Sequence, residues 1–127
     1  MDMLLANVSW LGVIVGAVLA FLVGWLWYSP MLFGRQWAAG NDVELGSAAN
    51  MPMAAMGTQA LGLLLLAWTV AVLMASGIWV IALATIAYGA MQISGGLFAK
   101  KSNAVIGIEF GYLVVSVVLM YVVALIL

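Results

Sequence analysis

The chain has 127 residues, of which 69% are hydrophobic and 6% are charged, and it contains neither cysteine nor histidine. Soluble domains are about half apolar and about a quarter charged, so this composition is typical of a chain embedded in a membrane. The lack of cysteine excludes disulfides and thiolate metal sites, and the lack of histidine removes the commonest general base. A net charge of −1 argues against nucleic acid as a partner.

Four apolar segments follow one another along the chain, and each is long enough to cross the ~30 Å hydrocarbon core of a bilayer. The first is expected over about residues 8–28 and ends at Ser29-Pro30, because proline disfavours helical geometry in the residue before it. The other three are expected at about 54–75, 78–98 and 104–127. The sequence therefore predicts an all-α fold, one transmembrane domain over residues 1–127 that forms an integral membrane four-helix bundle.

The loops place the basic residues on one side of this bundle. Arg35 lies in the polar loop of about 29–53, and Lys100 and Lys101 lie in the loop of about 99–103. Since these loops follow the first and third spans, they share a face of the membrane. The positive-inside rule predicts that this face is cytoplasmic, with both termini on the non-cytoplasmic side of a bacterial inner membrane. Residues 31–40 of the first loop are expected to form a short interfacial helical turn, with Phe33 and Trp37 toward lipid.

An internal match joins the ends of the first and third spans. Residues 24–35, GWLWYSPMLFGR, align without a gap on residues 89–100, GAMQISGGLFAK, and the alignment pairs Gly24 with Gly89, Ser29 with Ser94, and Arg35 with Lys100. This favours two helical hairpins related by an axis along the membrane normal, a parallel repeat of the kind that some transporters use. Chance agreement in a biased composition is the alternative.

Glu109 is the one acidic residue inside a predicted span. An ionisable side chain at the membrane centre costs at least ~2.5 kcal/mol, so such a group faces a partner or water. At 1.5 Å per residue, Glu109 lies ~9 Å and Gln92 ~12 Å in from the cytoplasmic ends of their helices, which brings them to nearly one level. Gln59 and Tyr112 are expected to join them in a polar intramembrane site.

Two interpretations of this polar site stay open. It is either a cytoplasm-facing pocket for a proton, a cation or a lipid headgroup, or a structural network that joins helices. In the second case Glu109 is protonated, or is paired with Lys101 or Arg35. We favour the structural network, because buried polar groups in membranes must be satisfied whatever their purpose.

Small residues recur every four positions on the first and fourth spans. They are Gly12, Gly16, Ala20 and Gly24 on the first, and Gly107 and Gly111 on the fourth. This spacing lets helix backbones approach closely, so these residues are a candidate interface. Packing within the monomer and a seam for a second chain are both compatible with it.

Aromatic residues gather around the Ser-Pro break beside the single arginine: Trp25, Trp27, Tyr28, Trp37 and Arg35. Tryptophan and tyrosine collect at headgroup depth, so this cluster is expected to be an interfacial anchor. A lipid or a flat hydrophobic ligand, held by the aromatic rings with its acidic head on Arg35, is the alternative.

Two motifs carry a family resemblance: LWYSPMLFGRQW at residues 26–37, and GGLFAK followed by EFGYLVVSVVLM at residues 95–120. With them the chain resembles a bacterial integral membrane family called domain of unknown function 1761, over nearly its whole length. The resemblance implies a small four-helix membrane protein and brings no established activity. The chain departs from the family pattern at Ser94-Gly95-Gly96, where a more polar segment is usual.

These patterns favour a non-enzymatic membrane protein that acts by helix–helix association, as a homo-oligomer or as an accessory subunit of a larger membrane complex. The alternative is a small oligomeric transporter or channel with a polar site at Glu109 and Gln92. No catalytic constellation, metal site or cofactor site is predicted, and membrane lipids are the expected small-molecule partners.

Overall fold

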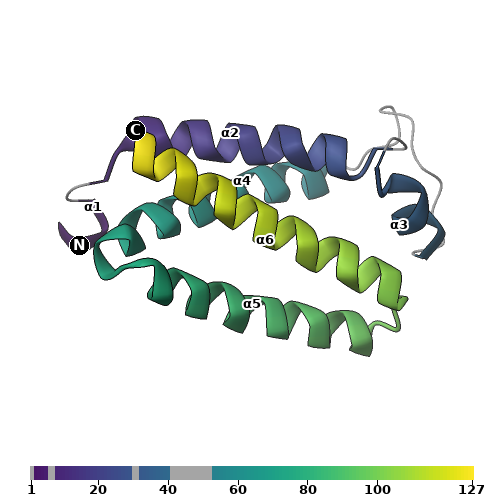
Figure 1. Cartoon of the computed structure of the whole chain (residues 1–127). Coiled ribbons are helices and arrows are strands. Elements are labelled where there is room, and N and C mark those ends of the chain that lie inside the picture. Colours follow the sequence, from purple (N-terminus) through teal and green to yellow (C-terminus); the bar gives the residue numbers. More distant parts are fainter. Residues whose placement is uncertain (1, 6–7, 30–31, 41–52) are drawn as a thin grey trace.

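A computed structural model of the chain describes residues 2–5, 8–29, 32–40 and 53–127. All regular structure in these residues is helical, which confirms the all-α prediction (Figure 1). The elements are α1 (Asp2–Leu5), α2 (Trp10–Trp27), α3 (Gly34–Gly40), α4 (Met53–Leu73), the 3-10 turn η2 (Met74–Ser76), α5 (Ile78–Phe98) and α6 (Asn103–Ile126).

Four helices are long and apolar enough to cross a membrane, as expected of a multi-pass membrane protein. They are α2, α4 with η2, α5 and α6. Successive spans run in opposite directions, so that α3 and the turn between α5 and α6 lie at one end of the bundle, while α1 and the C-terminus lie at the other (Figure 1). Arg35, Lys100 and Lys101 therefore share one end, called the basic end below.

The helix boundaries follow from local capping. Ser9 precedes α2 and its hydroxyl accepts a hydrogen bond from the Gly12 amide, and Ser102 does the same for α6 through the Val105 amide. At the other end of the bundle, Gly77 adopts φ +98° between η2 and α5. A side chain is strained in that conformation, so glycine suits this tight turn.

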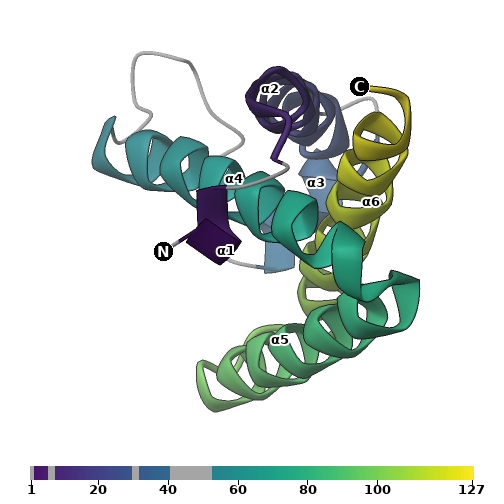
Figure 2. The same ribbon diagram turned by 90° about the vertical axis from the view of Figure 1, so that its left-hand side faces the viewer.

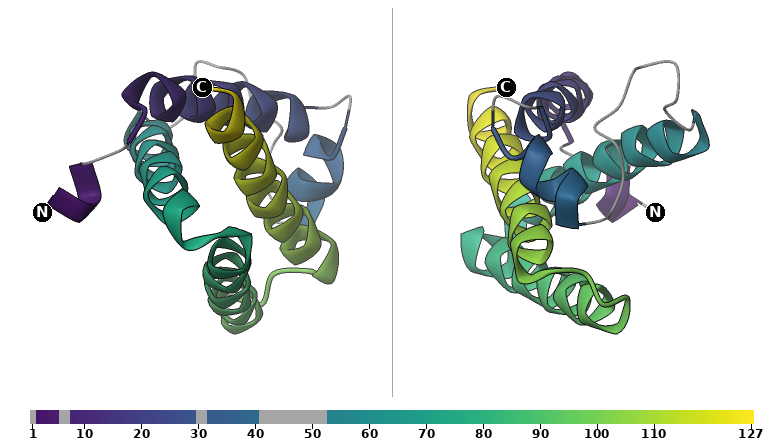
Figure 3. Two further views of the ribbon diagram at one scale, coloured as in Figure 1. Left: turned by 60° about the vertical axis from the view of Figure 1, so that its left-hand side comes forward. Right: turned by 90° about the vertical axis from the view of Figure 1, so that its right-hand side faces the viewer.

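Helix α2 lies against both α4 and α6, and α5 packs mainly on α6. In Figures 2 and 3, α5 lies apart from α2, with α4 and α6 between them. The centre of the core is formed by aliphatic side chains and one methionine from three helices: Val13, Ala17, Ala20, Leu63, Val70, Val117 and Met120. The core therefore lies between α2, α4 and α6, and α5 buries only Ile81, Gly89 and Gly96.

The internal sequence match does not correspond to a shared local structure. Helix α2 ends three residues after Gly24, whereas α5 continues to Phe98, nine residues after Gly89. The two glycines do share one feature, because each is buried against an aromatic ring of α6. The likeness of the two segments is thus confined to these glycines, and the parallel repeat remains a prediction.

Lys100, in the turn between α5 and α6, has a left-handed backbone conformation with φ +60°. Since this geometry costs an L-residue about 1 kcal/mol, Lys100→Gly is expected to stabilise the protein by about that amount relative to Lys100→Ala. Both variants lose the charge, so their difference isolates the backbone. The free energy of unfolding in mixed micelles measures it, and equal values for the two variants would contradict the expectation.

Candidate functional site

The aromatic motif after α2 folds back onto α6. The Trp27 indole Nε1 donates a hydrogen bond of 3.0 Å to the Ile108 carbonyl, and its ring lies 4.7 Å from the Phe33 ring. The Phe33 amide donates to the Trp27 carbonyl at 3.1 Å, which reverses the chain between α2 and α3. The predicted short helix is therefore present as α3, but Phe33 packs on Trp27 rather than facing lipid.

Tyr28 lies at the centre of a second aromatic group. Its ring meets the rings of Tyr112 and Trp37 edge-on, at centroid distances of 5.6 and 5.5 Å. Burial raises the pKa of the Tyr28 phenol above its ordinary value, and the nearby Glu109 carboxylate raises it further. Tyr28 is a neutral hydroxyl at physiological pH, as an ordinary tyrosine is.

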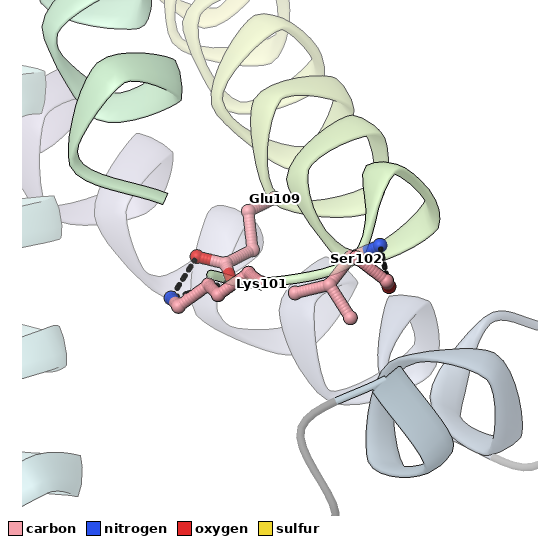
Figure 4. Close-up of polar contacts among 4 residues, drawn as sticks. Lys101, Ser102 and Glu109 are labelled. Atoms are coloured by element: carbon pink, nitrogen blue, oxygen red, sulfur yellow. Dashed lines mark hydrogen bonds and ion pairs between the residues drawn. The ribbon is translucent and has the colours of Figure 1, made fainter. Parts of the chain in front are cut away.

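Glu109 is paired with a lysine, one of the two alternatives in the structural interpretation. The Lys101 Nζ lies 2.9 Å from one carboxylate oxygen of Glu109 and 3.2 Å from the other (Figure 4). The side chains of Lys101 and Glu109 are 34% and 20% exposed, so the pair lies at the edge of the bundle rather than in its centre. It joins the turn before α6 to the second turn of that helix.

Tyr112 continues the polar group into the bundle. Its hydroxyl donates a buried hydrogen bond of 2.6 Å to the Ala20 carbonyl of α2. The side chains of Gln59, from α4, and Ser116, one turn further along α6, are neighbours of the Tyr112 hydroxyl. Three helices thus contribute to one polar cluster, which we define as Gln59, Tyr28, Glu109, Tyr112 and Ser116.

Gln92 lies on the side of α5 that faces α6. Its neighbours on this face are Gly89, which packs against Phe110, and Gly96, which packs against Ile106, so Gln92 lies at the level of Glu109 in the seam between α5 and α6. Its Oε1 is buried without a hydrogen-bond partner in the described part of the chain. Of the four residues predicted to meet, Gln59 and Tyr112 are neighbours, Glu109 lies one turn before Tyr112 on α6, and Gln92 lies on α5 at the level of Glu109.

The prediction missed two members of the polar cluster, Tyr28 and Ser116. Ser116 was detectable, because Glu109, Tyr112 and Ser116 are spaced i, i+3 and i+7 and therefore share one face of α6. The role of Tyr28 depends on how α2 lies against α6, and its place beside three other aromatic residues suggested a lipid-facing position instead.

The small residues of α2 pack against other parts of the same chain. Gly12, Gly16, Ala20 and Gly24 are all buried. A Cβ at Gly16 would lie 3.5 Å from the Met120 Cγ, and one at Gly24 would lie 2.5 Å from the Tyr112 hydroxyl oxygen. The candidate interface on α2 is thus the seam with α6 of the same chain.

On α6 the two glycines differ. Gly111 faces the Trp27 ring, because a Cβ at Gly111 would lie 3.1 Å from the Cζ2 of that ring, whereas a side chain at Gly107 would meet nothing within 4 Å. Gly107 alone among the predicted small residues has space for a second helix.

The aromatic anchor divides in a similar way. Trp27, Tyr28 and Trp37 make the ring contacts described above. Trp25 is 67% exposed and Arg35 is exposed, so these two are placed where lipid contact requires. Three of these five residues therefore pack within the bundle, and only Trp25 and Arg35 face outward as an interfacial anchor would.

Chemically, the polar cluster consists of hydroxyls, an amide and a carboxylate neutralised by lysine. Such groups hold water or a proton, and the cluster contains no activated nucleophile. No group of three His, Cys, Asp or Glu residues gathers within the described ranges.

The model of a family described as "Protein of unknown function (DUF1761)" matches residues 11–125. No curated protein and no solved structure matches the chain.

Proposed function

Since the chain belongs to the DUF1761 family, whose function is unknown, we propose from its surfaces that it acts by helix–helix association in the membrane. It does so as a homo-oligomer or as a subunit of a larger membrane complex. The contact face that we propose is formed by α5 and the first half of α4, and not by α2, whose small residues are already buried.

The observation that carries this proposal is the exposed start of α4. Residues 57–62, Gly-Thr-Gln-Ala-Leu-Gly, are all exposed, and a side chain at Gly57 or Gly62 would meet nothing within 4 Å. Small residues in a span let another helix approach closely.

Helix α5 extends the same unpartnered surface. It contacts α6 along one side, and its other sides expose large side chains, among them Leu83, Met91 and Phe98. A span that buries so little of its length in its own bundle is available for another chain.

We also propose an orientation in the membrane. With α3 and the turn between α5 and α6 at one end, the positive-inside rule favours a basic end in the cytoplasm of a bacterial inner membrane. Both termini then lie on the non-cytoplasmic side.

Cysteine cross-linking in the native membrane tests the contact face, because the wild-type chain contains no cysteine. Gly62→Cys and Leu83→Cys are expected to form cross-linked species of higher mass with a short bifunctional maleimide. Val118→Cys, at an exposed position of α6, is the matched control and is expected to remain uncross-linked.

Cross-linking at α4 and α5 no greater than at Val118 would contradict the proposal. Cross-linking at Gly107→Cys without any at Gly62→Cys would place the contact on α6 and would contradict the proposed face.

A further inference from the structure

We infer that Ser116, Tyr112 and Gln59 form an internal water site, reached from the basic end of the bundle along the side of α6 that carries Glu109. This inference rests on the polar cluster alone and does not depend on the proposed association.

Ser116 supplies the first observation. It is 1% exposed, and its Oγ makes no hydrogen bond with any described residue. Hydroxyls in spanning helices commonly donate to the carbonyl one turn earlier, as Thr58, Thr69 and Thr85 all do here at 2.6–2.8 Å. Ser116 does not, and its hydroxyl lies beside the Tyr112 hydroxyl without a hydrogen bond of good geometry, so a water between the two groups would satisfy it. A buried unsatisfied hydroxyl costs about 1–3 kcal/mol.

The neighbours of Ser116 have free hydrogen-bonding capacity that suits water. The Tyr112 hydroxyl donates its hydrogen bond to the Ala20 carbonyl, so its oxygen lone pairs remain available to accept hydrogen bonds. Gln59 reaches the same hydroxyl from α4 with an amide that both donates and accepts. A buried water makes about two to four hydrogen bonds, and these three side chains provide that number.

The route to the site follows one face of α6. Glu109, Tyr112 and Ser116 occupy positions i, i+3 and i+7, and the next residues on this face, Met120 and Val123, are apolar and buried. Ser116 lies 13 residues past Asn103 in sequence, or about 20 Å along the helix at 1.5 Å per residue. The polar path therefore runs from the basic end to about the middle of the span and stops there.

A separate cavity of about 180 Å³ lies at the opposite end of the bundle, lined by residues that include Ser9, Gly12, Ala71 and Met120. Ser116 does not line it. Met120 lies one turn beyond Ser116 on α6 and lines this cavity, so along the helix it lies between the water site and the cavity.

Water-edited solid-state NMR of the labelled protein in lipid bilayers tests the inference. Magnetisation transferred from water is expected to reach Ser116 and Tyr112 several times faster than Met120, and Glu109 fastest of all. Equally slow transfer to Ser116 and Met120 would overturn the inference. Faster transfer to Met120 than to Ser116 would also overturn it, because water would then enter from the cavity end.

A pair of variants separates the water site from general hydration. Ser116→Ala is expected to reduce the transfer from water to Tyr112, and Ser94→Ala, at an exposed serine of α5, is expected to leave it unchanged. Unchanged transfer to Tyr112 in Ser116→Ala would contradict the site. Alanine fits the space of serine, so the variant keeps the fold, which helical circular dichroism confirms.

Discussion

Gly34→Ala is expected to lower the free energy of unfolding by about 3 kcal/mol, at the upper end of what overpacking usually costs. A Cβ at Gly34 would overlap the Tyr28 carbonyl oxygen and would lie 2.7 Å from the Ser29 carbonyl carbon. These are backbone atoms of a tight reversal in which the Gly34 amide donates to the Ser29 carbonyl at 2.9 Å. They cannot move aside as a flexible side chain does, so α3 is expected to detach from α6.

The matched control is Gly62→Ala, because Gly62 lies in open space within α4. Alanine there is expected to leave stability unchanged or to raise it by up to about 1 kcal/mol, as usual for glycine inside a helix. Unfolding in mixed micelles, followed by tryptophan fluorescence, measures both variants. Equal stability of Gly34→Ala and Gly62→Ala would show that the reversal after α2 is not as described.

Gly16→Leu is expected to cause a loss of similar size for a different reason. A Cβ at Gly16 already lies 3.5–3.9 Å from Met120, and the neighbouring Ala20 is completely buried. A leucine therefore has to push α2 away from α6, which costs about 1–3 kcal/mol and opens the core.

Gly107→Leu is the control for this substitution, since Gly107 faces open space on α6. It is expected to leave the free energy of unfolding of the isolated chain unchanged within about 0.5 kcal/mol. If Gly16→Leu instead kept full stability and altered only the oligomeric state, the assignment of the α2 glycines to the internal seam would be wrong.

The all-α bundle was predictable because the physical signals were local. Each span is an uninterrupted apolar run of the right length, and Ser29-Pro30 ends the first one within two residues of the observed helix end at Trp27. Lys101 was one of the two predicted partners of Glu109, since both residues lie near the same turn, and the structure shows this pair.

The packing of particular faces was harder to predict because it depends on how helices are arranged around one another. The α2 glycine stripe is compatible with any close helix, and only the structure shows that its partner is α6. Tryptophan commonly lies at the membrane interface, so the sequence predicted an anchor and not the contacts of Trp27 and Trp37 with the rest of the bundle.

Native mass spectrometry of the wild-type protein, extracted gently from its own membrane, tests the central claim most directly. An associating membrane protein is expected to appear at the mass of two or more chains, or of one chain with a foreign subunit. A population that consists only of single 13.4 kDa chains, with or without bound lipid, would contradict the account.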